Sequence, residues 1–427
     1  MKARYRFRLY PHPHQRTALA QLFGCCRRVW NDSLAHCQEL RAAGEKTPSG
    51  YALRNWMVGA KAEVPWLAAA PSTPLCESVL DLAVAYKNFW ASCTGKRKGP
   101  KVRAPRFKSK RDSRQAARFT RQGFRCHERT LQLQKIGKVP IEWSRDLPAE
   151  PSSCTVIRDA SGRYFASFVV EVAGANSCAI RPQDGRVIGI DLGLASLAVT
   201  SDGEKVPLPK HFDAARKRLR RLQRQAARKR RCVPKGTKAS NRLKAVDRKI
   251  ARLHARVADQ RTNGLHQLTS RLVRDHDFIA IEDLNVSAML KAPKPVLDEA
   301  MQRWLPNGRA SKRGLARSIS DAGWATFRTM LEQKADRAGK RVVAVNPAYT
   351  SQRCNQCGHT EKANRPKQDT FRCQSCGHTE HADINAARNI LEAGLALSGR
   401  GALCNSEPRS VAGCEASTHL KVMAHAA

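Results

Sequence analysis

Four cysteines in the last quarter of the chain have the spacing of a metal site. They form two Cys-x-x-Cys pairs, Cys354 with Cys357 and Cys373 with Cys376, separated by fifteen residues. Each two-residue loop lets both thiolates of a pair reach one ion, and the segment between the pairs is expected to fold back as a hairpin that completes a tetrahedron. Four thiolates leave no open coordination position, so the pattern predicts one structural Zn²⁺ ion rather than a catalytic metal.

Other uses of these cysteines fit the chain less well. Two disulfides would need an oxidising compartment, whereas most of the remaining cysteines are scattered singly, as buried thiols in a reducing cytosol are. A thioredoxin-like redox use of one pair lacks the βαβ context that such a motif requires. His359 and His378 follow the pairs closely and are taken as bystanders, because four sulfurs already complete the shell.

Three acidic residues stand where they could share metal ions. Asp191 ends the strand-like run VIGID, Glu282 ends FIAIE, and Asp383 begins the helical pattern DINAARNIL. In both strand-like runs, alternate isoleucines are expected to face a core while the acid points to the other face. Mg²⁺ prefers oxygen ligands, and two Mg²⁺ ions about 3.5–4 Å apart can activate a water and stabilise the leaving oxygen of a phosphodiester. We therefore predict that the three carboxylates hold two Mg²⁺ ions and are the catalytic residues.

Each acid has a simpler interpretation when it is taken alone. A strand-end aspartate is commonly a turn residue, Asp383 could cap its helix, and Glu282 has Asp283 beside it. The combination is more informative, because a hairpin strand with Asp, a later strand with Glu and a helix with Asp occur in that order in a highly basic chain. That order favours an RNase H-like nuclease fold.

The charge of the chain predicts a polyanionic partner. Its 427 residues include 77 Lys and Arg against 36 Asp and Glu, a formal net charge of +41. A ribosomal-type binding protein would have a similar charge, so the charge alone does not indicate an enzyme. No long uncharged apolar run, lipidation motif or secretory leader is found, which argues against a membrane partner and against secretion.

Two segments concentrate the positive charge. Residues 94–114 are dense in Lys and Arg with one Phe, and residues 212–275 read as a basic helical hairpin broken at 232–238. So many like charges repel one another without a counter-ion, so we expect both segments to contact phosphates. The candidate contacts are Lys96, Arg97, Lys101, Arg106, Lys108, Lys110, Arg218, Arg221, Arg228 and Arg231.

The surrounding pattern is that of an α+β or α/β multidomain protein. It predicts a strand over 4–10, helices over 14–93 and short strands over 117–172 with a hairpin turn at 159–162. A second hairpin opens near residue 186, a strand covers 277–286, and a helix over 316–339 leads into a strand over 340–349.

These segments together resemble the TnpB family of transposon-encoded RNA-guided nucleases, which are related to type V CRISPR effectors. The likeness covers about residues 2–393 and is carried by FRLYPHPHQ, FGCCRRVWN, PRFKSKRDSRQ, IGIDLGLASLAVTSDG, IEDLNV, NPAYTSQRCNQCG and FRCQSCGHTEHADINAARNIL. It implies a wedge-type β-barrel with a helical recognition insert, then a RuvC-like (RNase H-like) nuclease domain interrupted by a helical hairpin and a zinc ribbon. The corresponding ranges are 1–13 and 94–180 for the barrel, 14–93 for the insert, 181–350 and 381–396 for the nuclease, 351–380 for the ribbon and 397–427 for a disordered tail.

The resemblance also implies an activity. It implies a cytoplasmic, nucleoid-associated monomer of a bacterium or archaeon. This monomer would carry a guide RNA from the transposon end and cleave double-stranded target DNA next to a short transposon-adjacent motif. Asp191, Glu282 and Asp383 match the first, second and third RuvC acids. One departure is visible, because many relatives have Asp-Arg-Asp where this chain has His381-Ala382-Asp383.

Three other functions are weighed against this one. A cleavage-inactive RNA-guided repressor would have lost acids of the triad, and all three are present. A general zinc-ribbon RNA-binding protein would carry no defined guide RNA. A DDE transposase has its acids in the order Asp, Asp, Glu, unlike this chain.

Overall fold

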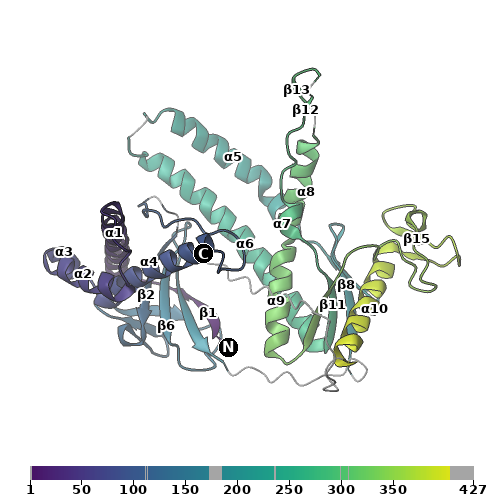
Figure 1. The fold of residues 1–427 in the computed structure, drawn as a ribbon, viewed down its shortest axis with the longest axis horizontal. Helices are drawn as coiled ribbons and strands as arrows, with labels where there is room; N and C mark the ends of the chain where they lie inside the picture. The colour runs from purple at the N-terminus through teal and green to yellow at the C-terminus, as the bar shows by residue number, and fades with distance from the viewer. Residues whose placement is uncertain are drawn as a thin grey trace. The chain divides into compact units, whose positions relative to one another are not determined.

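The computed structural model describes residues 2–110, 112, 114–172, 185–234, 237–298, 300–305 and 307–403, the last four without their side chains. The chain forms two compact units that divide at residue 173 (Figure 1), and each is described by itself. Within the described residues, no helix combines the length and the apolar character needed to cross a bilayer.

The first unit is built on a seven-stranded antiparallel sheet of order β2-β6-β7-β1-β5-β4-β3. Its strands are β1 (Lys2–Leu9), β2 (Gln115–Thr120), β3 (Phe124–Cys126), β4 (Thr130–Leu133), β5 (Gly137–Glu142), β6 (Ser153–Arg158) and β7 (Tyr164–Glu171). The predicted hairpin turn at 159–162 connects β6 to β7, and Gly162 adopts φ 86° there.

The expected closed β-barrel is not formed by these strands. The edge strands β2 and β3 are consecutive in the chain but belong to no common ladder among the described strands. The 3₁₀ turn η1 (Arg121–Gly123) follows β2 directly, and β3 after it is only three residues long and pairs with β4 alone among the described strands. The sheet is therefore open at this point.

Four helices separate β1 from β2. They are α1 (Pro13–Ala42), α2 (Gly50–Ala62), α3 (Pro65–Ala68) and α4 (Ser72–Cys93). Helix α1 begins with Pro at its first position, and the His12 N–H donates to Gln15 Oε1 at 3.0 Å, which satisfies a backbone donor that the helix start leaves free. Buried side chains of the sheet, such as Phe119 and Phe168, share one core with Leu19 and Leu75 of the helices.

The second unit contains a five-stranded mixed sheet of order β10-β9-β8-β11-β14. Strands β8 (Val187–Asp191), β9 (Ser196–Thr200) and β10 (Lys205–Pro207) are antiparallel neighbours, whereas β11 (Phe278–Glu282) and β14 (Arg341–Val345) run parallel to β8. A parallel neighbour requires a crossover connection, which the helices supply.

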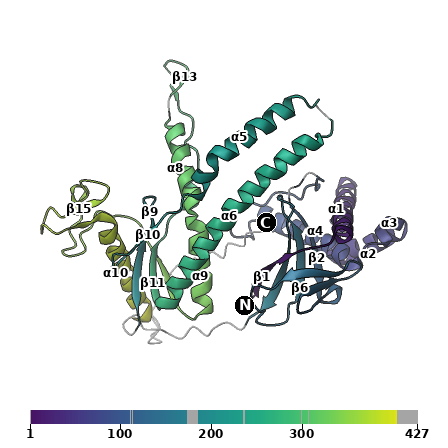
Figure 2. The same ribbon diagram turned by 180° about the vertical axis from the view of Figure 1, so that it is seen from behind.

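Helices cover both faces of this sheet (Figures 1 and 2). On one face, Ile188, Ile190, Ile279 and Ile281 pack against α6 (Asn241–Asp275) and α9 (Trp324–Arg337). On the other face, α10 (Ala382–Leu403) covers β8 and β11. The strands β8 and β11 are therefore buried on both sides, as central strands of α/β sheets usually are.

The remaining helices and hairpins extend from this sheet. Helices α5 (His211–Arg231) and α6 form the predicted basic hairpin through an apolar contact of Ala226, Leu243 and Val246. The short elements α7 (Val286–Met289), β12 (Leu297–Asp298) and β13 (Arg303–Trp304) precede α8 (Arg309–Ala322).

The single helix predicted over 316–339 is two helices, and that prediction is wrong. Helix α8 ends at Ala322, and α9 begins at Trp324 after Gly323, whose φ of 73° is left-handed. A Cβ at Gly323 would come within 3.1 Å of the Arg261 side chain, so the break is also a close contact with α6.

A small ribbon joins β14 to α10. It contains η2 (Lys362–Asn364), β15 (Thr370–Arg372) and β16 (Thr379–His381), with β15 and β16 paired antiparallel. Helix α10 continues to Leu403, past residue 396 where the nuclease segment was expected to end. The rest of the expected tail, 404–427, lies outside the described residues.

Candidate metal centres

The register of the central strands aligns two of the three acids. Ala280 of β11 lies opposite Gly189 of β8 in a parallel ladder. Two residues further along each strand come Glu282 and Asp191, on the same face of the sheet as Ala280 and Gly189, because side chains alternate in a strand. The two carboxylates therefore leave neighbouring strand ends in the same direction.

Helix α10 brings the third acid to the same place. It packs so closely on β8 that a Cβ at Gly189 would come within 2.1 Å of the Ala387 carbonyl oxygen. Asp383 lies one helical turn before Ala387, and Asp191 lies two strand residues after Gly189. Both steps cover roughly 6–7 Å towards the same end of the sheet, since a helix rises about 1.5 Å and a strand about 3.4 Å per residue.

The electrostatic surroundings of Asp191 include both other acids. Burial raises the pKa of Asp191 to about 7, and the charges of Glu282 and Asp383 add to the rise, whereas the Arg365 guanidinium opposes it. Burial also raises the pKa of Glu282, against the effect of a hydrogen bond from Thr350. Such crowded carboxylates repel one another unless a cation or a proton lies between them.

Two partners of the acids were not predicted from the sequence. The Thr350 hydroxyl donates to Glu282 Oε1 at 2.7 Å, and Arg365 Nη2 donates to Asp383 Oδ1 at 3.0 Å. Thr350 lies in the motif NPAYTSQRCNQCG, which could have drawn attention to it. Arg365 lies in the middle of the ribbon, where no spacing or periodicity marks it.

The contacts of Asp383 and Asp283 bear on two of the simpler interpretations, the cap role of Asp383 and the choice between Glu282 and its neighbour Asp283. The N–H of Asp383 donates to His381 Nδ1 at 3.3 Å, so the histidine that replaces the family's acid accepts from the helix start. This leaves the Asp383 carboxylate to Arg365 and to the other acids. Asp283 forms a partly exposed ion pair with Arg328 and is not among the charges acting on Asp191.

The four cysteines form a second centre. Their sulfurs all lie within 4.8 Å of one another, with 3.7 Å between Cys354 and Cys376 and 3.6 Å between Cys357 and Cys373. A tetrahedral Zn²⁺ site with bonds of about 2.3 Å has sulfur-to-sulfur edges of about 3.8 Å, so the cluster fits this ion. It is the only group this tight among the described residues, and His359 and His378 are not part of it.

Each cysteine pair is shaped by a knuckle turn. Gly358 and Gly377 adopt φ values of 77° and 72°, which glycine accepts without strain. Their N–H groups donate to the carbonyl oxygens of the first cysteine of each pair, at 3.0 and 3.2 Å. The two turns are thus built alike.

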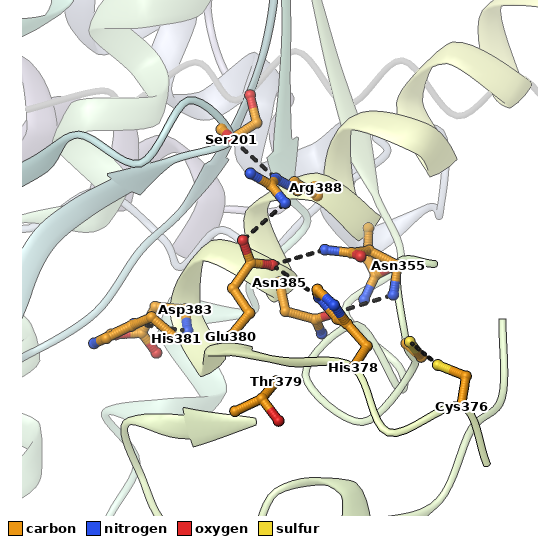
Figure 3. Close-up of polar contacts among 12 residues, drawn as sticks. Ser201, Asn355, Cys376, His378, Thr379, Glu380, His381, Asp383, Asn385 and Arg388 are labelled. Carbon is orange, nitrogen blue, oxygen red and sulfur yellow. Dashed lines mark hydrogen bonds and ion pairs between the residues drawn. The ribbon is translucent and has the colours of Figure 1, made fainter. Parts of the chain in front are cut away.

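A polar network joins the ribbon to α10 and to the sheet (Figure 3). The Glu380 carboxylate accepts from Asn355 Nδ2 at 2.9 Å and pairs with Arg388 Nη1 at 2.8 Å. Arg388 Nε in turn donates to the Ser201 carbonyl oxygen at 3.3 Å, in the turn between β9 and β10. Asn385 of α10 accepts from the Asn355 N–H at 3.0 Å. The ribbon is therefore fixed to the helix that carries Asp383.

The predicted phosphate contacts have different surroundings. On α5, Arg218, Arg221, Arg228 and Arg231 are exposed. In the first unit, Lys96, Lys101, Arg106 and Lys110 are exposed and Arg97 is half-buried. Lys108 differs, because its ammonium lies 3.7 Å from the centre of the Trp30 ring. That cation–π contact holds the segment against α1.

A mixed sheet with carboxylates converging at its strand ends, beside a four-cysteine ribbon, is typical of nucleases that use metal ions. The match to protein families agrees. Residues 324–390 match a family described as "Cas12f1-like, TNB domain", residues 167–292 one described as "Probable transposase", and residues 1–46 one described as "Helix-turn-helix domain".

Curated relatives cover almost the whole chain. A "Putative RNA-guided DNA endonuclease" of Streptomyces pristinaespiralis is 36% identical over 94% of this chain and 91% of its own. The protein InsQ of Escherichia coli, which bears the same description, is 38% identical over 94% of each chain. The chain belongs to the TnpB family of transposon-encoded RNA-guided DNA endonucleases, as its motifs predicted.

Similarity to solved structures is more distant. A cryo-EM structure of a Cas12f1–sgRNA–target DNA complex aligns with 87% of this chain and 81% of its own, at 15% identity and a TM-score of 0.46.

Proposed function

We propose that this protein is an RNA-guided endonuclease that hydrolyses DNA phosphodiesters with two Mg²⁺ ions held by Asp191, Glu282 and Asp383. The observation that carries the proposal is the strand register, which aligns the first two acids and brings α10 with the third against them. The raised pKa of Asp191 supports it, since this carboxyl group is buried and lies near the charges of the other two acids, and a bound cation would offset both effects.

The acids suit Mg²⁺ because all three offer carboxylate oxygens, the ligands that hard cations prefer. When bound, the ions supply an activated water and neutralise the charge that develops on the phosphate. Thr350 orients the Glu282 carboxylate through its hydroxyl. Arg365 lies beside Asp383 and contributes a positive charge near the position of the phosphate.

The ribbon serves a structural purpose in this proposal. Four cysteine sulfurs at tetrahedral spacing suit one Zn²⁺ ion and leave it no open position for a substrate. Because the network around Glu380 ties the ribbon to α10, binding of zinc helps to fix Asp383. The ion therefore acts on catalysis through the geometry of the helix.

We assign the binding of nucleic acid to the basic surfaces of α5 and of residues 94–114. The exposed arginines of α5 and the exposed cations of 94–114 would contact the phosphates of the guide RNA or of the RNA–DNA heteroduplex, largely without reading sequence. The protein itself would read only a short flanking motif. We further propose that the sheet of the second unit is an RNase H-like fold, that the first unit is the wedge and recognition part, and that the working form is a bacterial or archaeal monomer with RNA.

The test begins with the RNA that copurifies with the protein. We expect one defined species that ends in a variable guide, and Mg²⁺-dependent cutting of a plasmid that carries the matching target. A heterogeneous RNA mixture would favour a general RNA-binding protein. A defined RNA with target binding but no cutting would favour a repressor.

A further inference from the structure

Tyr349 combines a strained backbone with an exposed aromatic ring. Its φ of 67° lies in the left-handed region, which bulky side chains rarely adopt. The residue is nevertheless 66% exposed, so packing of its ring in the core does not explain the conformation. Glycine would fill the same turn without strain.

The strain lies next to the acid cluster. The following residue, Thr350, donates to Glu282 Oε1 at 2.7 Å, and its carbonyl oxygen accepts from Asn389 Nδ2 of α10 at 2.9 Å. Since consecutive Cα atoms are about 3.8 Å apart, the Tyr349 Cα lies within about 9 Å of the Glu282 carboxylate. The ring is therefore attached to the edge of the proposed active site.

The surrounding contacts hold the strained conformation in place. The Tyr349 carbonyl oxygen accepts from the N–H groups of Gln352 and Arg353, at 2.9 and 3.0 Å. The chain then enters the first cysteine knuckle, while Thr350 fixes the other side. A residue held in an unfavourable conformation by its whole surroundings indicates a functional requirement for its side chain.

The chemistry of the surroundings indicates what the ring would contact. Arg353, Arg365 and Arg388 lie on the adjoining ribbon and helix, each paired with a carboxylate, and the chain as a whole has a net charge of +41. An exposed aromatic ring at the edge of a site proposed to cut DNA suits a nucleobase, and stacking tolerates any base. A protein partner is less suited, because one isolated ring offers little apolar area.

We propose that Tyr349 stacks on an unpaired nucleobase of the DNA strand beside the phosphate to be cut, and so positions that strand over the acids. This inference rests on the proposed nuclease function and adds a substrate-contacting residue to it. The left-handed turn presents the ring towards the strand while Thr350, the next residue, holds Glu282.

Because the Tyr349 backbone is left-handed, a variant can remove the ring without straining the fold. Tyr349→Gly removes the ring and at the same time relieves the backbone, so its unfolding temperature should equal or exceed that of the wild type. Tyr349→Phe keeps the ring and loses only the hydroxyl. Tyr51→Ala is the matched control, because Tyr51 is 69% exposed but lies on α2 in the other unit.

The experiment uses the purified protein with its RNA and a target strand that carries one 2-aminopurine, moved along the strand one position at a time. In this experiment the protein also carries Asp191→Asn, so that the target strand is not cut. We expect quenching of the fluorescence at one position in the wild type, in Tyr349→Phe and in Tyr51→Ala, and its loss in Tyr349→Gly. In the cleavage-competent background, Tyr349→Gly should raise KM about tenfold or more, and an abasic site at the quenched position should cost the wild type the same factor.

Failure of this inference is distinguishable from failure of the proposed function. If the wild type quenches at one position but never cuts, Tyr349 stacks as proposed and the nuclease assignment is wrong. If Tyr349→Gly quenches and cuts like the wild type, the stacking role is refuted. An unfolding temperature well below the wild type in Tyr349→Gly would also overturn it, because the ring would then serve the fold.

Discussion

The burial of Asp191 and Glu282 lowers the stability of the fold when no metal is bound. Both are partly buried at neighbouring strand ends, and burial raises the pKa of each carboxyl group. Because Asp191 has a folded pKa of about 7 and an unfolded one near 4, the unfolded chain loses this proton first. The metal-free fold is therefore destabilised progressively as the pH rises between these two values.

Asp191→Asn should remove this penalty. In metal-free protein at pH 8, we expect the variant to unfold at a higher temperature than the wild type, corresponding to about 1–3 kcal/mol. At pH 4, where the carboxyl of the wild type is protonated, the difference should nearly vanish. Thermal unfolding at both pH values checks the sign. A variant less stable than the wild type at pH 8 would contradict this penalty.

Thr350 is predicted to matter for activity through Glu282. Thr350→Val keeps the shape of the side chain and removes the hydroxyl that donates to Glu282 Oε1. We expect kcat to fall about tenfold, the effect of losing roughly 1.4 kcal/mol of transition-state stabilisation. Thr350→Ser keeps the donor and should retain most of the activity. Equal losses in both variants would mean that packing, and not the hydrogen bond, is the contribution of Thr350.

At the scale of elements, the contact of α10 with β8 determines whether the acids meet. Gly189 leaves so little space that an added Cβ would overlap the Ala387 carbonyl oxygen at 2.1 Å. Gly394 forms a similar contact with Ala280, where the distance would be 2.7 Å. Both glycines let the helix lie flat on the sheet, and the position of Asp383 depends on this approach.

Gly189→Ala should displace α10. We expect a loss of about 1–3 kcal/mol or more in stability, as overpacking of a core typically costs, together with a loss of cleavage larger than the unfolded fraction explains. Gly264→Ala on α6 is the control, because nothing lies within 4 Å of a Cβ there, and it should be neutral or stabilising. Circular dichroism melts and cleavage rates separate the two effects, and wild-type behaviour of Gly189→Ala would contradict the contact.

The zinc ribbon allows a second test at this scale. Cys376→Ser should reduce bound zinc from one ion to none per chain and abolish cleavage, although all three acids remain. Cys232→Ser is the control, since Cys232 is an exposed cysteine at the end of α5 and not a ligand. Zinc is measured by atomic absorption after dialysis. Full cleavage by a zinc-free Cys376→Ser protein would show that the zinc-bound ribbon is not needed to position Asp383.

For the whole molecule, the predictions that held are those that depend on short spacings. The Cys-x-x-Cys pairs, the strand ends at Asp191 and Glu282 and the helix start near Asp383 are local patterns, and the structure contains each of them. The basic hairpin of α5 and α6 was likewise visible in its charge and its break at 232–238.

The predictions that failed depend on contacts distant in sequence. Closure of the first sheet depends on whether β2 pairs with β3, and these two described strands share no ladder. The break at Gly323 lies close to the side chain of Arg261, 62 residues earlier. Thr350 reaches Glu282 because β14, which precedes it, pairs with β11, and Arg365 reaches Asp383 from the ribbon. None of these contacts leaves a periodic signal in the sequence.

The central claim is that Asp191, Glu282 and Asp383 together hold the ions that cut DNA. The direct measurement is Mg²⁺-dependent cleavage of a matched plasmid by the protein with its RNA, for Asp191→Asn, Glu282→Gln, Asp383→Asn and the neighbouring control Asp283→Asn. We predict that each of the first three loses cleavage by at least a thousandfold while still binding RNA and target, and that Asp283→Asn cuts like the wild type. Cleavage within tenfold of the wild type by any of the three would contradict the account.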